Sequence, residues 1–121
     1  MKRRQVSVYG DMTGAEIEVA DFLARHNIYW LFEQPVFLMD EKDRPRVWNP
    51  DFYLPELGVY IEVCGTPRDK DYNYRRDVYN INAIPVIFVQ TYKGPRWKNY
   101  LLSQLNAIHE MRWEIIRNIN L

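Results

Sequence analysis

Two carboxylates that flank a predicted β-hairpin are the residues of this sequence best suited to chemistry. Asp51 follows a proline in the segment 49–65, NPDFYLPELGVYIEVCG, and Glu62 lies near the end of its apolar second strand. A turn centred on Pro-Glu-Leu-Gly sets Asp51 opposite Glu62 or Val63, where cross-strand Cβ atoms are ~5 Å apart. Two carboxylates this close repel each other unless a proton or a cation lies between them, and Mg²⁺ prefers such oxygen ligands. The sequence therefore predicts a metal site at the end of this hairpin.

The alternation of side chains along the second strand assigns its residues to two faces. Glu62 and Cys64 share one face of the strand. Ile61 and Val63 then point into the opposite layer. Taken singly, Asp51 after a proline is typical of a turn, and a glutamate between two apolar residues is typical of a half-exposed strand. It is the pairing of the two carboxylates that favours a functional role.

The Pro-Asp dipeptide, the short hairpin and the glutamate at the end of an apolar strand together resemble the PD-(D/E)XK, or restriction-endonuclease-like, nucleases. The core of that family has the element order α-β-β-β-α-β, which this sequence also predicts over most of its length. Many members carry a Glu in the first helix a few residues before an Ala and a Leu, and Glu16, Ala20 and Leu23 match. The resemblance implies a Mg²⁺-dependent endonuclease, a nickase or a structure-selective enzyme, that hydrolyses DNA phosphodiester bonds.

The resemblance also implies a role for each residue of the site. Asp51 and Glu62, with the carbonyl of Val63, would bind one or two Mg²⁺ ions, for which Mn²⁺ would substitute. Glu16 would be an outer ligand, and its alternative role is a capping box with Thr13 at the start of a helix. No organic cofactor is expected.

Cys64 departs from the pattern of the family. It occupies a catalytic position two residues after Glu62, where the family has a Lys that orients the attacking water and stabilises the phosphate. Either a basic residue elsewhere replaces this Lys, with Arg75, Arg76 and Lys70 as candidates, or the domain binds nucleic acid or a partner without cleaving it. Cys64 itself is also typical of a small buried residue.

The distribution of charge along the chain is compatible with a DNA partner. The formal net charge is zero, which argues against a protein that coats nucleic acid by bulk charge. Residues 1–62 nevertheless hold 7 basic and 11 acidic side chains, whereas residues 63–121 hold 9 basic and 5 acidic ones. The basic excess falls on the second helix, on the loop 93–98 and on the last helix, where a phosphate backbone could run. The side chains assigned to nucleic-acid binding are Arg68, Lys70, Arg75 and Arg76.

Periodicity and turn signals predict the elements that must position these residues. Helices are predicted over 14–26, 69–80 and 96–118, and strands over 29–34, 36–39, 46–49, 52–54, 59–64 and 85–89. Residues 1–12 are predicted to form an irregular start. We expect an α/β fold, a three-layer α-β-α sandwich around a central mixed β-sheet that is restriction-endonuclease-like and ends in a long C-terminal helix.

Length and composition set the remaining bounds. A chain of 121 residues is expected to form a single domain over 1–121, and its one cysteine excludes an intrachain disulfide and a cysteine zinc cluster. Because no apolar run reaches the roughly 20 residues of a membrane span and none resembles a signal peptide, we expect a cytoplasmic protein with no membrane partner. The last helix, with Trp113 and Ile116, is more apolar than one face requires, which predicts either a homodimer contact or a cap over the sheet.

Overall fold

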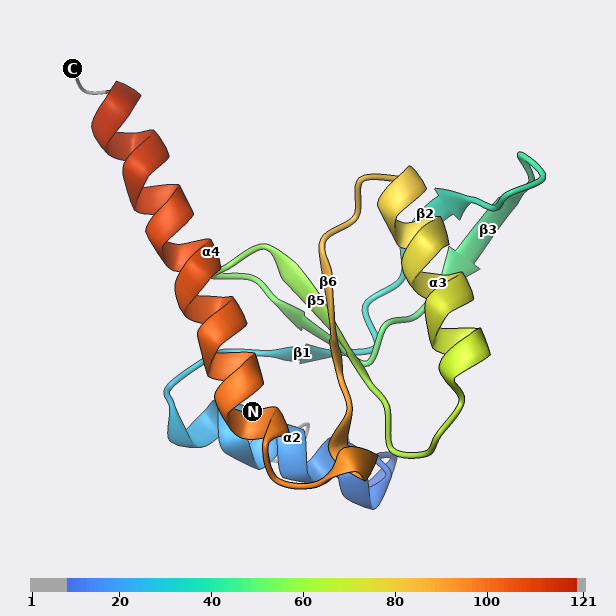
Figure 1. Cartoon of the computed structure of the whole chain (residues 1–121), viewed down its shortest axis with the longest axis horizontal. Helices are drawn as coiled ribbons and strands as arrows, with labels where there is room; N and C mark the ends of the chain where they lie inside the picture. The colour runs from blue at the N-terminus through green and yellow to red at the C-terminus, as the bar shows by residue number, and fades with distance from the viewer. Residues whose placement is uncertain (1–8, 120–121) are drawn as a thin grey trace.

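A computed structural model describes residues 9–119 of the chain (Figure 1). Its helices are α2 (Gly14–Arg25), α3 (Asp69–Ile81) and α4 (Trp97–Ile119), and a 3₁₀ turn, η1 (Thr91–Lys93), precedes α4. Its strands are β1 (Leu31–Phe32), β2 (Val36–Met39), β3 (Pro45–Trp48), β4 (Phe52–Leu54), β5 (Val59–Val63) and β6 (Val86–Val89). The three predicted helices are confirmed to within one residue at each end. Residues 1–8 of the predicted irregular start lie outside the described residues, and the prediction is wrong for residues 9–10, which are helical.

The central sheet is mixed, as expected, and has the strand order β1-β4-β5-β6. Strands β4 and β5 are antiparallel with Phe52 paired to Ile61, and continuing this register by one residue sets Asp51 opposite Glu62. The turn between them closes at Gly58, whose φ of 67° lies in the left-handed region that favours glycine. β6 runs parallel to β5 after the crossover through α3, and it forms one edge of the sheet.

The strands β2 and β3 form a separate two-stranded sheet and do not extend the central one. Only one face of this hairpin is buried, because Val36 and Leu38 pack against α3 while Phe37 and Met39 remain exposed. Asn82 at the end of α3 fixes the hairpin there, since its side chain bonds both the N–H and the carbonyl of Met39. The strand predicted over 29–34 is also shorter than expected and is reduced to the two residues of β1.

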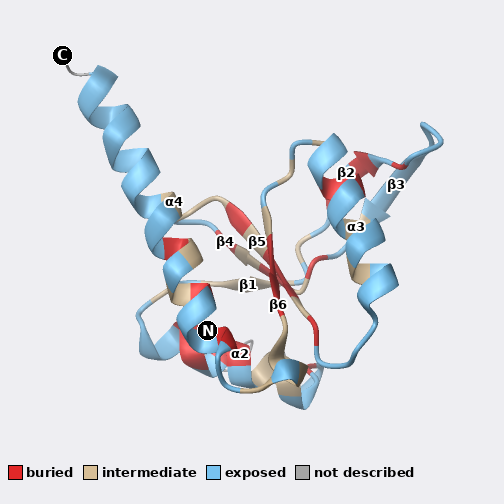
Figure 2. Ribbon diagram, in the orientation of Figure 1, coloured by how far each residue is buried: buried red, intermediate tan, exposed pale blue. Residues whose placement is uncertain are grey.

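Helices cover both faces of the central sheet (Figure 1). α2 and the first half of α4 pack on one face, where their side chains surround Phe52, Ile61 and Val89. α3 covers the other face, where Val78 and other buried side chains form a second cluster. The buried strands β5 and β6 lie between these two apolar layers (Figure 2).

α4 buries its side chains against the body of the protein only over its first half. Leu101 and Leu105 are buried, and Arg112 makes a late contact by donating a hydrogen bond to the carbonyl of Glu56. Beyond it the helix extends past the sheet and is exposed (Figure 2). The exposed apolar side chains of this part are Trp113, Ile115, Ile116 and Ile119. The homodimer contact therefore stays a prediction. No helix in the described part of the chain is long and apolar enough to cross a membrane.

The unequal packing of α4 predicts a large loss of stability for one alanine substitution on this helix and a small loss for another. Leu101→Ala empties a fully buried position and should lower the free energy of unfolding by about 2–4 kcal/mol. Ile115→Ala, at a half-exposed position, should change it by about 0.5 kcal/mol or less. Urea denaturation of both variants measures the difference, and equal losses would show that the second half of α4 is buried in solution.

Candidate active site

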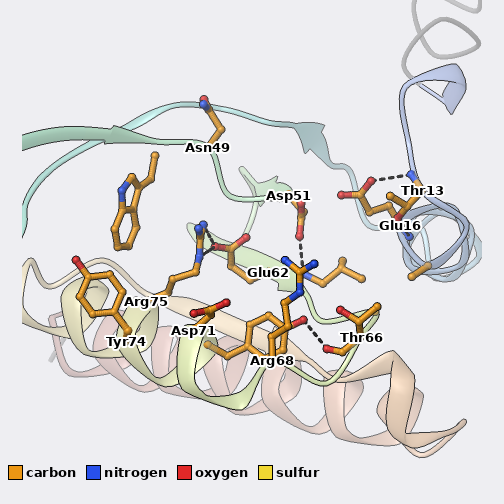
Figure 3. A pocket seen from close by; sticks show the side chains of 15 residues that line it. Thr13, Glu16, Asn49, Asp51, Glu62, Thr66, Arg68, Asp71, Tyr74 and Arg75 are labelled. Carbon is orange, nitrogen blue, oxygen red and sulfur yellow. Dashed lines mark hydrogen bonds and ion pairs between the residues drawn. The ribbon is translucent and has the colours of Figure 1, made fainter.

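A pocket of about 830 Å³ opens where the carboxyl end of β5 meets α2 and α3 (Figure 3). Six residues that the sequence assigned to the site line it: Glu16, Asp51, Glu62, Val63, Arg68 and Arg75. The other lining residues are Thr13, Ala15, Trp48, Asn49, Gly65, Thr66, Asp71, Tyr72 and Tyr74. Segments from three parts of the chain thus bring the predicted carboxylates into one cavity.

Asp51 is held at the end of β5 by the backbone. Its Oδ2 accepts a hydrogen bond of 2.6 Å from the N–H of Val63, across the hairpin that the sequence predicted. Burial, a hydrogen bond with Glu16 and the negative charge of Glu62 raise the pKa of Asp51 to about 8, although the Val63 N–H opposes this rise. In Figure 3 Asp51 lies between Glu16 and Glu62. It is therefore a carboxyl that retains its proton at neutral pH unless a cation approaches.

Glu16 takes part in a cap and also lines the pocket. The N–H of Thr13 donates to Glu16 Oε1 at 2.8 Å, and the N–H of Glu16 donates to Thr13 Oγ1 at 3.2 Å, so the predicted capping box is confirmed. α2 lies tightly against the end of β5, since a Cβ at Gly65 would come within 3.2 Å of the Cβ of Ala15. This close approach places Glu16 beside Asp51, and its role as an outer ligand stays a prediction.

Glu62 is buried, at 7 % exposure, and is held entirely by α3. Its Oε2 accepts hydrogen bonds from Arg75 Nε at 2.7 Å, from Arg75 Nη2 and from the hydroxyl of Tyr79 at 2.8 Å. The guanidinium of Arg75 also lies 4.9 Å from the ring centroid of Trp48, which covers it from β3. A cation supplied by the chain therefore already balances the charge of Glu62.

Cys64 lies outside the pocket. It is fully buried beneath α3, in the cluster that includes Val78 and Phe88. Burial and the negative charges of Glu62 and Asp51 raise the pKa of its thiol to about 12. The structure thus places Cys64 as the small buried residue that was its alternative interpretation.

Two further residues assigned to the site are not brought into it. Arg76 follows Arg75 on α3, but its guanidinium lies over the ring of Phe88, 4.8 Å from the centroid, and lines a different depression. Lys70 is exposed on α3 and does not line the pocket. Of the three candidates to replace the Lys, the structure therefore brings Arg75 into the pocket and not Arg76 or Lys70; consecutive residues on a helix point about 100° apart, so Arg75 and Arg76 face different ways.

Tyr79 and Trp48, which position Arg75 and Glu62, were not predicted from the sequence. One signal was available, because Tyr79 stands four residues after Arg75 and so lies on the same face of α3. Trp48 offered no comparable signal. Its place over Arg75 depends on how the hairpin β2–β3 packs against α3, and that contact is not encoded by local spacing.

Asp51 and Glu62 are the residues that could hold a metal ion here. The described residues contain no group of three or more His, Cys, Asp or Glu side chains placed for this purpose. Mg²⁺ keeps several waters, however, and is commonly bound through one or two carboxylates. Both carboxylates line the same pocket, and the raised pKa of Asp51 marks a group whose negative charge a cation would stabilise. The donor set therefore fits a hydrated Mg²⁺ or Mn²⁺ ion.

Comparisons of the chain with protein-family models, with curated proteins and with solved structures give no match. The function of the pocket must therefore be argued from its own geometry.

The raised pKa of Asp51 predicts that the metal-free protein loses stability as the pH rises. Between the usual carboxyl pKa near 4 and about 8, the folded chain keeps a proton on Asp51 that the unfolded chain releases, so the free energy of unfolding falls across this window. Asp51→Asn removes this proton linkage and should flatten the dependence. Urea denaturation in EDTA at pH 5 and pH 8 measures it. Asp43→Asn, in the exposed turn of the hairpin β2–β3, is the control, and equal slopes for both variants would refute the assignment.

The burial of Cys64 predicts that its thiol reacts slowly in the folded protein. Because its pKa is about 12 and its side chain is fully buried, a disulfide reagent such as Ellman's at pH 8 should react far more slowly with the folded chain than with the urea-unfolded one. Since this is the one cysteine of the chain, the signal reports a single site. Equal rates in both states would place the thiol in an open position and return it to the candidate site.

Proposed function

We propose that this chain is a Mg²⁺-dependent endonuclease of the restriction-endonuclease-like fold that hydrolyses DNA phosphodiester bonds, as a nickase or a structure-selective enzyme. One observation carries the proposal: the carboxylates of Glu16, Asp51 and Glu62, with Asp71 of α3 as a fourth, line one pocket that cationic side chains also line. Carboxylates that share a site with cations suit a reaction in which a metal ion meets an anionic substrate. Neither feature is needed to stabilise an ordinary surface cleft.

The order of the elements around the pocket supports the same proposal. A helix precedes the strands, a hairpin carries the two carboxylates, and a helical crossover leads to a parallel strand. This is the arrangement that the resemblance to the PD-(D/E)XK nucleases implies. It places the candidate ligands at the carboxyl end of a parallel pair of strands, where open α/β sheets commonly bind their ligands.

The proposed roles of the two ligands follow from which of their oxygens are engaged. Asp51 uses Oδ2 for the N–H of Val63 and also hydrogen-bonds Glu16, so a cation would bind Oδ1 in place of the proton between the two carboxyls. Glu62 uses Oε2 for three hydrogen bonds, so Oε1 is its available oxygen. When bound, Mg²⁺ would polarise the phosphoryl group and activate a water. The chain's own part is to hold the two carboxylates in fixed orientations, through the hydrogen bonds to Asp51 Oδ2 and Glu62 Oε2.

Two arginines divide the work that the missing Lys would do. Arg75 balances the charge of Glu62 from α3, which the motif Lys cannot do from a buried position 64. Arg68, at the N-terminal cap of α3, also lines the pocket, and it takes part in none of the ion pairs found among residues 9–119. We assign Arg68 to the phosphate of the DNA, since a free guanidinium presents several donors to phosphate oxygens.

A non-catalytic nucleic-acid-binding module on the same fold is the second candidate. The observation that favours it is the bond between Arg75 and Glu62, because an internal cation already occupies a carboxylate that a nuclease would give to the metal. Such a module would keep the pocket and the cationic side chains. It would bind DNA with or without a divalent ion and leave it intact.

Cleavage of DNA by matched variants tests the proposal. Wild-type protein with Mg²⁺ or Mn²⁺ should nick supercoiled plasmid or cut single-stranded or branched DNA. Asp51→Asn should lower the rate by about 100-fold or more, because the metal ion loses a negatively charged carboxylate ligand. Asp43→Asn makes the same chemical change in an exposed turn and should leave the rate unchanged.

Two outcomes would contradict the nuclease. Asp51→Asn cutting at the wild-type rate would show that any activity belongs to another site or to a contaminant. Wild-type protein that binds these substrates and cuts none of them with either metal would instead support the binding module.

A further inference from the structure

A second depression of about 450 Å³ lies on the far side of α3 from the candidate active site, beside the free edge of β6. In Figure 1, β6 runs between α3 and α4. Residues of both helices line the depression. We call this depression the edge groove. Its lining residues are Arg76, Phe88, Gln90, Lys93, Gly94, Arg96, Trp97 and Tyr100.

The edge groove is positively charged and contains no acidic side chain. Arg76, Lys93 and Arg96 line it, and none of them takes part in an ion pair found among residues 9–119. Arg76 lies over Phe88, with its CZ atom 4.8 Å from the ring centroid, and donates one hydrogen bond of 3.0 Å to the side chain of Asn73. Neutral partners hold this guanidinium in place and leave most of its donors available to an anion.

One aromatic side chain of the groove is available to a ligand. Phe88 and Trp97 are 5 % exposed each, so they form the wall, whereas Tyr100 is 48 % exposed. A half-exposed ring beside unpaired cations is the combination that single-stranded nucleic acids use, because the backbone meets the cations and a base stacks on the ring. A purely anionic ligand such as inorganic phosphate would make no use of Tyr100.

The edge groove neighbours the candidate active site across β5 and β6, although no residue lines both cavities. Phe88 lies directly beside Glu62 in the parallel register of β5 and β6, so the two sites are one strand apart, ~4.8 Å at their nearest backbones. Consecutive arginines of α3 serve the two sides, with Arg75 bonded to Glu62 and Arg76 lying over Phe88. The candidate site and the cationic edge groove therefore flank the same helix.

The surface on the other side of the loop that precedes α4 lacks the unbalanced positive charge of the edge groove. There a separate depression is lined by Glu18 and Asp21 together with Lys98, so cations and acids are mixed. A polyanion gains little from that surface. Of these two depressions, only the edge groove is lined by cations without acids, so we expect a bound strand to run along it from α3 toward the start of α4.

We propose that the edge groove binds the phosphodiester backbone of a DNA strand next to the bond in the candidate site, with one base stacked on Tyr100. The proposal deepens the proposed nuclease by locating where its substrate strand runs. Binding in the groove itself requires no metal and no cleavage.

Binding of single-stranded DNA in EDTA tests the groove without any chemistry. Fluorescence anisotropy of a short fluorescein-labelled oligothymidine is measured over a series of salt concentrations. The triple variant Arg76→Gln, Lys93→Gln, Arg96→Gln should bind about tenfold or more weakly and lose about 2 from the slope of log affinity against log salt. The control removes the same charge elsewhere, by Arg25→Gln, Lys42→Gln and Arg117→Gln, and should stay close to the wild type.

Two substitutions of Tyr100 test the stacked base. Tyr100→Ala should weaken binding by about fivefold or more, whereas Tyr100→Phe keeps the ring and should bind as the wild type does. Equal affinity of the alanine and phenylalanine variants would overturn the stacking contact.

The failure of the groove and the failure of the nuclease give different results. Wild-type protein that does not bind the oligothymidine, or a triple variant that binds like its control, overturns the edge groove even if plasmid is cut. Groove-dependent binding by a protein that cuts no DNA with Mg²⁺ or Mn²⁺ upholds the edge groove and contradicts only the nuclease.

Discussion

The buried carboxylate of Glu62 is the group on which the packing of the sheet against α3 depends. A carboxylate at 7 % exposure is costly unless it is paired and fully hydrogen-bonded, and α3 supplies both the cation of Arg75 and the hydroxyl of Tyr79. Trp48 then covers Arg75 from the hairpin β2–β3, which brings that hairpin into the same arrangement. The packing of α3 on the sheet and the candidate site therefore share one set of contacts.

The two carboxylates that the hairpin brings together are not equivalent. Glu62 receives a cation from the chain, whereas Asp51 receives one backbone N–H and faces Glu16, a second carboxyl. This asymmetry leaves the side of the pocket between Asp51 and Glu16 as the side that needs a proton or an external cation. In the proposed enzyme, that requirement would be met by the metal ion, and in its absence by the proton that the raised pKa of Asp51 describes.

Local patterns were sufficient for the helices, for the hairpin and for the pairing of its carboxylates. The register of β4 and β5 follows from the length of the turn, and the faces of β5 follow from simple alternation, so Asp51 and Glu62 could be paired from the sequence.

What could not be predicted depends on the rotation of α3 against the sheet. That rotation decides that Arg75 faces the site and Arg76 faces the edge groove. It is set by the burial of Val78 and Tyr79 in a helix that is otherwise polar, a signal too sparse to fix an angle. The separation of β2 and β3 from the main sheet depends equally on distant contacts, such as that of Asn82 with Met39.

The cysteine at the position where the resemblance implies a lysine is explained by the same contacts. Position 64 lies on the face of β5 that carries Glu62, and it is covered by α3. A lysine there would have to place a long cationic side chain under the helix, in the space now shared with Val78 and Phe88. A small side chain lets α3 lie close enough for the hydroxyl of Tyr79 to reach Glu62 at 2.8 Å and for Arg75 to bond the same oxygen. Cys64 and Arg75 thus act together. Arg75 supplies the positive charge beside the carboxylate of Glu62 from α3, and the small side chain of Cys64 leaves space for α3 to pack on β5.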